Sequence, residues 1–145
     1  MSFYADYIFP VVLDVATKPL KPQRQQTIAL AKGRILEIGI GTGANLPFYG
    51  SDASEIIGIE PELPMLKKAE LMVKKAPSQA VVKLAVGDAH QLDFADNSFD
   101  TVIMCLVLCT IPDPLQALKE AYRVLKPDGQ LLFLEHVRAP SSWVA

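Results

Sequence analysis

The feature that most constrains the fold of this chain is a glycine-rich segment at residues 37–43, Glu-Ile-Gly-Ile-Gly-Thr-Gly, which directly follows an apolar run. This pattern predicts a buried strand that ends in a tight turn. Without side chains, Gly39 and Gly41 let the backbone turn sharply and approach a ligand closely. Such a turn suits a nucleotide-like ligand. Because Ala44 follows Gly43, the segment also fits the Gly-x-Gly-x-x-Gly/Ala fingerprint of dinucleotide sites, so the turn alone leaves the ligand open.

Two acidic residues lie at the ends of later apolar runs and narrow the choice of ligand. Glu60 ends the second run, 21 residues after Gly39. A carboxylate in that position can accept hydrogen bonds from both hydroxyls of a ribose. Asp88 lies in Gly87-Asp88-Ala89, directly after the third run. Its carboxylate can accept a hydrogen bond from the exocyclic amine of an adenine.

Strand and helix patterns alternate along the chain from residue 33, which predicts an α/β fold with a doubly wound, Rossmann-like parallel sheet of about five strands. The carboxyl ends of such strands share one rim, where ligands bind. We therefore expect Gly39, Glu60, Asp88 and Leu106 to meet there although they are far apart in sequence. The expected strands are 34–38, 56–59, 81–86, 101–106 and 130–135.

Helices are expected between these strands, over residues 44–49, 64–75 and 113–125. The apolar stripe expected to be buried by the last of these is Leu115, Leu118, Tyr122 and Leu125. The second helix carries Lys67, Lys68, Lys74 and Lys75. We interpret these lysines as a solvated helix face, with a phosphate-binding patch as the alternative.

Five motifs, in this order, resemble those of the class I S-adenosylmethionine-dependent methyltransferases. They are Glu37-x-Gly39-x-Gly41-x-Gly43, Glu60, Gly87-Asp88-Ala89, Phe99-Asp100-x-Val102 and Leu125-Lys126-Pro127-Asp128-Gly129. The resemblance covers about residues 33–137. Within the family, segments 45–49, 106–109 and 133–137 look like the methyltransferase-like subgroup near the ubiquinone and menaquinone biosynthesis enzymes, which includes membrane-associated alkyl-thiol methyltransferases.

The resemblance implies that the chain binds S-adenosylmethionine and releases S-adenosylhomocysteine. We expect Pro61 and Met65 to line the adenine pocket, and Cys105 and Leu106 to offer backbone carbonyls to the ammonium group of the cofactor. The full set of residues expected to bind the cofactor is Glu37, Gly39, Gly41, Gly43, Glu60, Pro61, Met65, Gly87, Asp88, Ala89, Cys105 and Leu106.

The activity that the resemblance implies is methyl transfer to a small apolar acceptor through S, O, N or C. His136 follows the fifth strand and is the candidate catalytic residue, because a histidine there could deprotonate a thiol or hydroxyl acceptor. Glu135 either orients it or stays solvated, and a purely structural His136 is the alternative. Two competing functions are a non-catalytic or incomplete S-adenosylmethionine-binding module and an NAD-dependent oxidoreductase on a similar sheet.

The expected organisation is an N-terminal helical lid at residues 1–32 and an S-adenosylmethionine-binding domain at residues 33–145. Tyr4 and Tyr7 are candidate lid residues, or ordinary core or surface aromatics. Sheets in the resembling family usually have seven strands, so five strands predict a domain truncated at its C-terminus. The fifth strand would then have an uncovered edge, and such edges recruit partners, which predicts a homodimer or another contact there.

Composition excludes several classes of protein. Fourteen basic and 16 acidic residues give a net charge of −2. The chain therefore lacks the excess of basic residues that is typical of nucleic-acid-binding proteins. Cys105 and Cys109 lie in an apolar run, which predicts two buried thiols in a reducing, cytoplasmic location, and their spacing is poor for a metal site. No apolar stretch approaches the roughly 20 residues of a membrane span. The apolar segment 7–15 leaves a peripheral membrane contact open.

Overall fold

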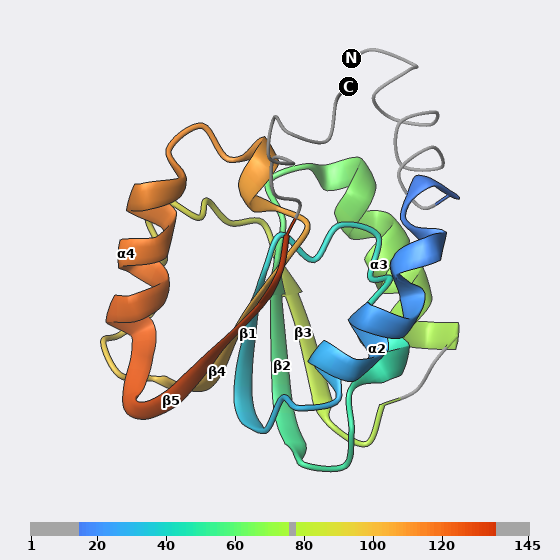
Figure 1. Cartoon of the computed structure of the whole chain (residues 1–145), viewed down its shortest axis with the longest axis horizontal. Coiled ribbons are helices and arrows are strands. Elements are labelled where there is room, and N and C mark those ends of the chain that lie inside the picture. Colours follow the sequence, from blue (N-terminus) through green and yellow to red (C-terminus); the bar gives the residue numbers. More distant parts are fainter. Residues whose placement is uncertain (1–14, 76–77, 136–145) are drawn as a thin grey trace, which may run out of the picture.

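The computed structural model describes residues 15–75 and 78–135 of the chain. Within these residues it contains a five-stranded sheet in the order β3-β2-β1-β4-β5, and every neighbouring pair is parallel (Figure 1). The strands are β1 (Gly33–Ile38), β2 (Ala53–Ile59), β3 (Val81–Ala85), β4 (Phe99–Cys105) and β5 (Leu125–Leu134). The predicted parallel sheet is therefore confirmed.

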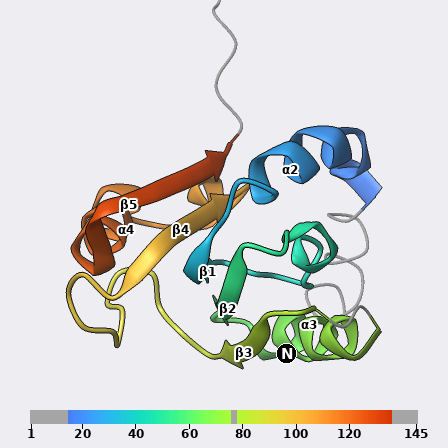
Figure 2. The same cartoon turned by 90° about the horizontal axis from the view of Figure 1, so that it is seen from below.

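Helices cover both faces of the sheet, as a doubly wound fold requires (Figure 2). α2 (Lys21–Ile28) and α3 (Leu63–Lys75) lie on one face and α4 (Pro114–Val124) lies on the other. The described residues also form the short 3₁₀ helices η2 (Lys18–Leu20), η3 (Leu46–Phe48) and η4 (Leu108–Thr110). The helix expected over 44–49 is thus only the turn η3, which ends where Tyr49 adopts an extended backbone.

The central strands are apolar on both sides because each of their faces is covered. Adjacent residues of a strand point to opposite faces, and in β1 both Ile35 and Leu36 are fully buried. Ile35 packs with Ile28 of α2, whereas Leu36 belongs to the core cluster that contains Ala117 of α4. Burial on both sides explains why these strands appear in the sequence as continuous apolar runs.

α4 buries only part of the stripe expected, since Leu118 and Leu125 pack half-buried against the core but the other two residues do not. Leu115 and Tyr122 are 62% and 82% exposed, whereas Ala117, Ala121 and Val124 are buried. The buried face of α4 is therefore rotated from the expected one, and its fully buried side chains are small, which suits close packing of a helix on a sheet.

β5 starts earlier than predicted and forms one outer edge of the sheet. Leu125 pairs with Phe99 and Gln130 pairs with Thr101, so the residues between Leu125 and Gln130 bulge out of the ladder. In the described part of the chain no strand pairs with the outer side of β5, and Phe133 on this strand is 64% exposed. The expected homodimer or other contact at this edge stays a prediction.

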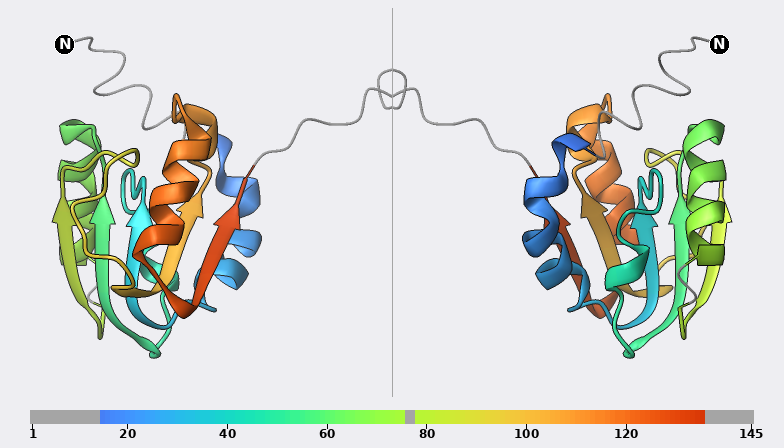
Figure 3. Two further views of the ribbon diagram at one scale, coloured as in Figure 1. Left: turned by 90° about the vertical axis from the view of Figure 1, so that its left-hand side faces the viewer. Right: turned by 90° about the vertical axis from the view of Figure 1, so that its right-hand side faces the viewer.

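The carboxyl ends of all five strands lie at the same end of the sheet (Figure 3). The chain passes outwards from β1 through β2 to β3 and then returns to the other side of β1 to form β4. Ligand-binding crevices of open α/β sheets lie where the strand order reverses in this way. The glycine-rich segment after β1 and the loop after β4 therefore flank one cleft.

Candidate functional site

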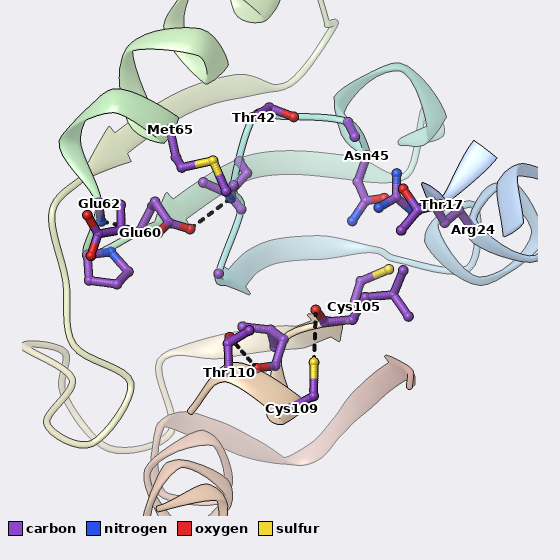
Figure 4. Close-up of a pocket in the computed structure, with 17 residues that line it drawn as sticks. Thr17, Arg24, Thr42, Asn45, Glu60, Glu62, Met65, Cys105, Cys109 and Thr110 are labelled. Carbon is purple, nitrogen blue, oxygen red and sulfur yellow. Dashed lines mark hydrogen bonds between the residues drawn. The ribbon is translucent and has the colours of Figure 1, made fainter. Parts of the chain in front are cut away.

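A cleft of about 280 Å³ lies at the carboxyl ends of β1, β2 and β4 (Figure 4). The residues that line it are Thr17, Arg24, Gly39, Ile40, Gly41, Thr42, Ala44, Asn45, Glu60, Pro61, Glu62, Met65, Cys105, Leu106, Val107, Cys109 and Thr110. A smaller pocket of about 130 Å³ adjoins it. The residues that line both are Gly39, Glu60, Pro61, Val107 and Thr110.

Gly41 presents bare backbone to this cleft. Its φ of +58° lies in the left-handed region, and a Cβ atom built on it would meet no atom within 4 Å. Gly39 also has a positive φ, of +73°, but a Cβ atom there would collide with the side chain of Val107. Packing against the loop after β4 therefore requires Gly39, whereas Gly41 leaves room for a ligand.

Glu60, directly after β2, connects that strand to the glycine-rich segment. Its Oε2 accepts a hydrogen bond of 3.0 Å from the Gly41 N–H, and its Oε1 accepts one of 3.1 Å from the Glu62 N–H (Figure 4). Burial raises the pKa of the Glu60 carboxyl, and these two hydrogen bonds oppose the rise. A carboxylate has about four acceptor positions, so two remain for the hydroxyls of a ligand.

Behind the cleft, Glu37 is a carboxylate that is only 1% exposed. It accepts hydrogen bonds of 2.7 Å from Asn45 Nδ2 and 2.6 Å from the Tyr49 hydroxyl. Burial raises its pKa to about 7, although both hydrogen bonds and the charge of Arg24 act to lower it. Burial and the neighbouring carboxylate also raise the pKa of Tyr49. Glu37 does not line the cleft, but it holds Asn45, which does.

The raised pKa of Glu37 predicts a pH-dependent stability. Because this pKa is about 7 when folded and 4.5 ordinarily, its contribution is fully present below pH 4.5 and is lost as the pH rises to 7. Each pKa unit corresponds to about 1.4 kcal/mol. The unfolding free energy of the wild type should therefore fall between pH 4.5 and 8. We expect this fall to be smaller in Glu37→Gln by on the order of 3 kcal/mol, as measured by urea denaturation.

The control for this experiment is Glu70→Gln, which alters an exposed carboxylate on α3. Glu60, whose pKa is also raised, contributes in the same direction and remains in both variants. Three other carboxyls have lowered pKa values, those of Glu55, Asp100 and Glu120. Their effect on stability therefore changes at lower pH, outside the pH range of this experiment. An identical pH slope in the wild type and Glu37→Gln would show that Glu37 titrates normally.

At the other end of the cleft, two buried polar atoms lack a hydrogen-bond partner among the described residues. They are Nε of Arg24, on α2, and Oδ1 of Asn45. Both residues line the cleft (Figure 4). Burying an unpaired polar atom costs free energy, so a ligand that paired with these two atoms would be favoured there. A cationic donor beside an amide acceptor fits a ligand group that carries both a negative and a positive charge.

The loop after β4 is fixed by an unusual backbone turn and by one carboxylate. Leu106 has a φ of +55°, and its N–H donates a hydrogen bond of 2.7 Å to the Leu134 carbonyl. Glu135 Oε1 accepts hydrogen bonds of 2.9 and 3.0 Å from the N–H groups of Val107 and Leu108. A non-glycine residue in this backbone region often marks a functional turn. Glu135 is thus half-buried and fixes this loop, a role that neither expectation for it included.

Asp88 lines the adjoining pocket with Gly87 and Ala89. Its Oδ1 accepts a hydrogen bond of 2.8 Å from the His90 N–H and lies 2.6 Å from His90 Nδ1. Hydrogen bonding to the backbone and then the side chain of His90 lowers the pKa of Asp88. Oδ2 takes no part in these bonds and can accept one from a ligand.

The structure brings most of the predicted cofactor-binding residues together. Those lining the main cleft are Gly39, Gly41, Glu60, Pro61, Met65, Cys105 and Leu106, and those lining only the adjoining pocket are Gly87, Asp88 and Ala89. Glu37 and Gly43 line neither. Gly43 instead packs tightly, since a Cβ atom there would lie 2.8 Å from Leu46 Cδ1 and 3.1 Å from the Ala69 backbone. His136, Tyr4 and Tyr7 lie outside the described residues.

Sequence reasoning missed several residues of the cleft. They are Thr17, Arg24, Ile40, Thr42, Ala44, Asn45, Glu62, Val107, Cys109 and Thr110. Asn45 had one signal, because it begins a segment that carries the family resemblance. Arg24 lies in the segment expected to form a lid, but no pattern singled it out, and the packing of α2 brings it to the cleft.

The two cysteines differ in their surroundings. Cys105 is buried at the end of β4, and burial raises the pKa of its thiol. Cys109 is exposed, so the prediction that both thiols are buried is wrong. Over residues 15–75 and 78–135, no cluster of three or more His, Cys, Asp or Glu side chains is placed to hold a metal ion. No helix described there is long and apolar enough to cross a membrane.

The sequence matches the model of a methyltransferase domain family over residues 36–133, which span the glycine-rich segment, Glu60, Asp88 and the loop after β4. The chain belongs to this methyltransferase domain family. The resemblance stated from the motifs is therefore confirmed.

Individual relatives and a solved structure agree with this. The chain is 36% identical to phosphatidylethanolamine N-methyltransferase of Cereibacter sphaeroides (72% of this chain, 51% of the relative). It is 31% identical to human thiol S-methyltransferase TMT1B (97% and 61%) and 37% identical to demethylmenaquinone methyltransferase of Lactiplantibacillus plantarum (77% and 50%). The YcgJ protein of Bacillus subtilis superposes with a TM-score of 0.70 at 28% identity (81% and 50%). The chain thus spans about half the length of the curated relatives it matches.

Proposed function

We propose that this chain binds S-adenosylmethionine in the main cleft and the adjoining pocket, and transfers its methyl group to a small apolar acceptor. The observation that carries the proposal is the chemical difference between the ends of the cleft. One end has the Glu60 carboxylate and the bare backbone of Gly41, and the other has the unpaired Nε of Arg24 and Oδ1 of Asn45. A ligand with hydroxyls at one end and an amino acid group at the other matches both.

In this proposal each part of the cofactor has its own residues. Glu60 accepts hydrogen bonds from the ribose, and Asp88 accepts one from the adenine. Arg24 pairs with the carboxylate of the amino acid group, and Asn45 Oδ1 accepts from its ammonium. Glu37 has an indirect role, since its hydrogen bond to Asn45 Nδ2 fixes the amide.

When bound, the cofactor supplies a methyl group already activated by a positively charged sulfur. The task of the protein is then to hold the acceptor in line with that methyl group. Apolar side chains of the cleft, among them Ile40, Leu106 and Val107, suit an apolar acceptor. The names of the relatives also point to acceptors with apolar parts: a lipid amine, a thiol and a quinone precursor.

The remaining expectations belong to the same proposal. His136 as the proton acceptor stays a prediction. Residues 1–32 as a lid are supported by Thr17 and Arg24, which line the cleft from that segment. A cytoplasmic location, a peripheral membrane contact and a second copy over β5 also stay predictions. A binding module without turnover is the alternative, because the relatives extend well beyond the length of this chain.

Calorimetry with S-adenosylhomocysteine tests the proposal, with NAD as the competing ligand. We expect S-adenosylhomocysteine to bind and NAD not to bind. Arg24→Met should weaken S-adenosylhomocysteine about 10- to 100-fold, because a hydrogen bond to a charged group contributes about 1.5–3 kcal/mol. The same variant should bind 5′-methylthioadenosine as the wild type does, because that ligand lacks the carboxylate.

Lys21→Met is the matched control, since Lys21 lies one turn earlier on α2 and does not line the main cleft. It should leave both affinities unchanged. If Arg24→Met weakened the binding of S-adenosylhomocysteine and 5′-methylthioadenosine equally, Arg24 would support the fold rather than bind the carboxylate of the ligand. Methyl transfer to a panel of thiols, lipid amines and quinols then separates an enzyme from a binding module.

A further inference from the structure

A second concave surface lies beside the cofactor cleft, between α3 and the η2–α2 segment. These elements lie on the same side of the sheet, with η3 between them (Figures 1 and 2). The groove has a volume of about 490 Å³. Its lining residues are Thr17, Lys18, Lys21, Arg24, Thr42, Ala44, Pro47, Phe48, Lys68, Leu71, Met72 and Lys75. We call it the cationic groove.

One wall of the cationic groove is a single face of α3. Lys68, Leu71, Met72 and Lys75 follow the spacing i, i+3, i+4, i+7, which places side chains on one side of a helix. Two lysines thus flank two apolar residues, and Leu71 is 54% exposed although it is large and apolar. The sequence could not reveal this arrangement, because whether these lysines face bulk water depends on what lies opposite.

The opposite wall adds further positive charge. Lys18 and Lys21 project from η2 and the start of α2, and Arg24 follows one turn later. Among the described residues, no acidic side chain lines the groove and none of its lysines forms an ion pair. Arg24 interacts with the buried Glu37, but the lysines that converge on the groove repel one another, and an anion there would relieve that repulsion.

The lining of the groove also contains apolar side chains. Phe48 and Pro47 come from η3, and Leu71 and Met72 from α3. A purely inorganic anion would use the lysines and leave these apolar side chains in water. An anionic group joined to an apolar chain would use both, because burial of apolar surface adds to the charge interaction.

The position of the groove connects it to the reaction. Thr17, Arg24, Thr42 and Ala44 line both the groove and the cofactor cleft. We propose that the cationic groove is the outer part of the acceptor site and binds an acceptor that carries a phosphate or carboxylate next to an apolar chain. This inference rests on the proposed function for its role in methylation, but anion binding in the groove can be tested separately.

The experiment is calorimetry with dodecyl phosphate below its micelle concentration, using protein saturated with S-adenosylhomocysteine. We expect saturable binding that weakens with added salt. Dodecanol, which has the same chain without charge, should bind at least about tenfold more weakly, because charge-assisted hydrogen bonds are the stronger kind. Vesicles of phosphatidylglycerol form a separate arm, which distinguishes a single amphiphile from a membrane surface.

Two double variants test the walls: Lys68→Gln with Lys75→Gln, and Lys18→Gln with Lys21→Gln. Each should weaken dodecyl phosphate about tenfold or more and leave S-adenosylhomocysteine affinity unchanged. The matched control is Lys67→Gln with Lys74→Gln, which removes two exposed charges of α3 that do not line the groove. The control should bind dodecyl phosphate as the wild type does.

Three results would overturn the inference: equal binding of dodecyl phosphate and dodecanol, equal loss in the control variant, or binding to vesicles but not to the single amphiphile. A failure of the proposed function gives a different result. In that case S-adenosylhomocysteine does not bind the wild type. Dodecyl phosphate, measured in the absence of S-adenosylhomocysteine, still binds the control variant more tightly than it binds the two groove variants.

Discussion

Glu60→Gln is expected to weaken S-adenosylhomocysteine binding by on the order of 100-fold, the largest effect of any single substitution considered. The carboxylate is held by the Gly41 and Glu62 N–H groups with its remaining acceptor positions free. An amide has one oxygen in place of two, so it cannot hold the backbone and accept from both ribose hydroxyls. The loss of one or two charge-assisted hydrogen bonds, each about 1.5–3 kcal/mol, gives this magnitude. Isothermal titration calorimetry measures it.

The unliganded stability of Glu60→Gln separates a binding role from a structural one. Burial disfavours the ionised form of Glu60 and raises its pKa. The uncharged amide removes that cost and loses one backbone hydrogen bond, so we expect the unfolding free energy to change by no more than about 1 kcal/mol. Glu70→Gln should change neither quantity. A large loss of unliganded stability with unchanged affinity would show that Glu60 only holds the loop.

Gly41→Ala is expected to weaken S-adenosylhomocysteine about 10- to 100-fold, since overpacking by one methyl group costs about 1–3 kcal/mol. A Cβ atom at Gly41 meets no protein atom within 4 Å, so it would occupy space left for the ligand. The positive φ of 58° adds a stability cost of about 1–2 kcal/mol for any residue with a side chain. Calorimetry and urea denaturation measure the two effects separately.

Gly50→Ala is the matched control, because Gly50 lies outside the cleft and its nearest atom to an added Cβ is 3.7 Å away. It should leave affinity and stability close to those of the wild type. Gly39→Ala should instead unfold the loop after β4, since its Cβ would collide with Val107. If Gly41→Ala binds the ligand as tightly as the wild type, the cofactor does not approach this backbone.

The sequence was most informative where a residue acts through its own backbone or charge. Gly41 and Glu60 were found from their spacing after apolar runs, and both line the cleft. It was least informative where a contact depends on a neighbour. Half of the apolar stripe predicted for α4 packs against the core, but Leu115 and Tyr122 are exposed, and Ala117 and Ala121 are buried. Helix periodicity gives the possible faces, and only the shape of the sheet selects one.

For the charged residues of α3, too, the sequence predicted the exposed side chains but not their contacts with distant segments. The lysines of α3 were interpreted as a solvated face, and Lys67 and Lys74 are exposed. Lys68 and Lys75, however, line a groove opposite Lys18. That pairing joins residues about fifty positions apart, and no local pattern encodes it.

The sequence by itself determined the parallel sheet, the rim at which its strands end, and the glycines and acids gathered there. It could do so because alternating apolar runs and helices permit few topologies, and strands joined by crossover helices pair in parallel, which brings every carboxyl end to one edge. Only the tertiary structure decided that Arg24 completes the cleft, that Glu135 fixes the loop after β4, and that two helices form a cationic groove. Each of these features depends on packing between segments that are far apart in the sequence, and no local sequence pattern specifies such contacts.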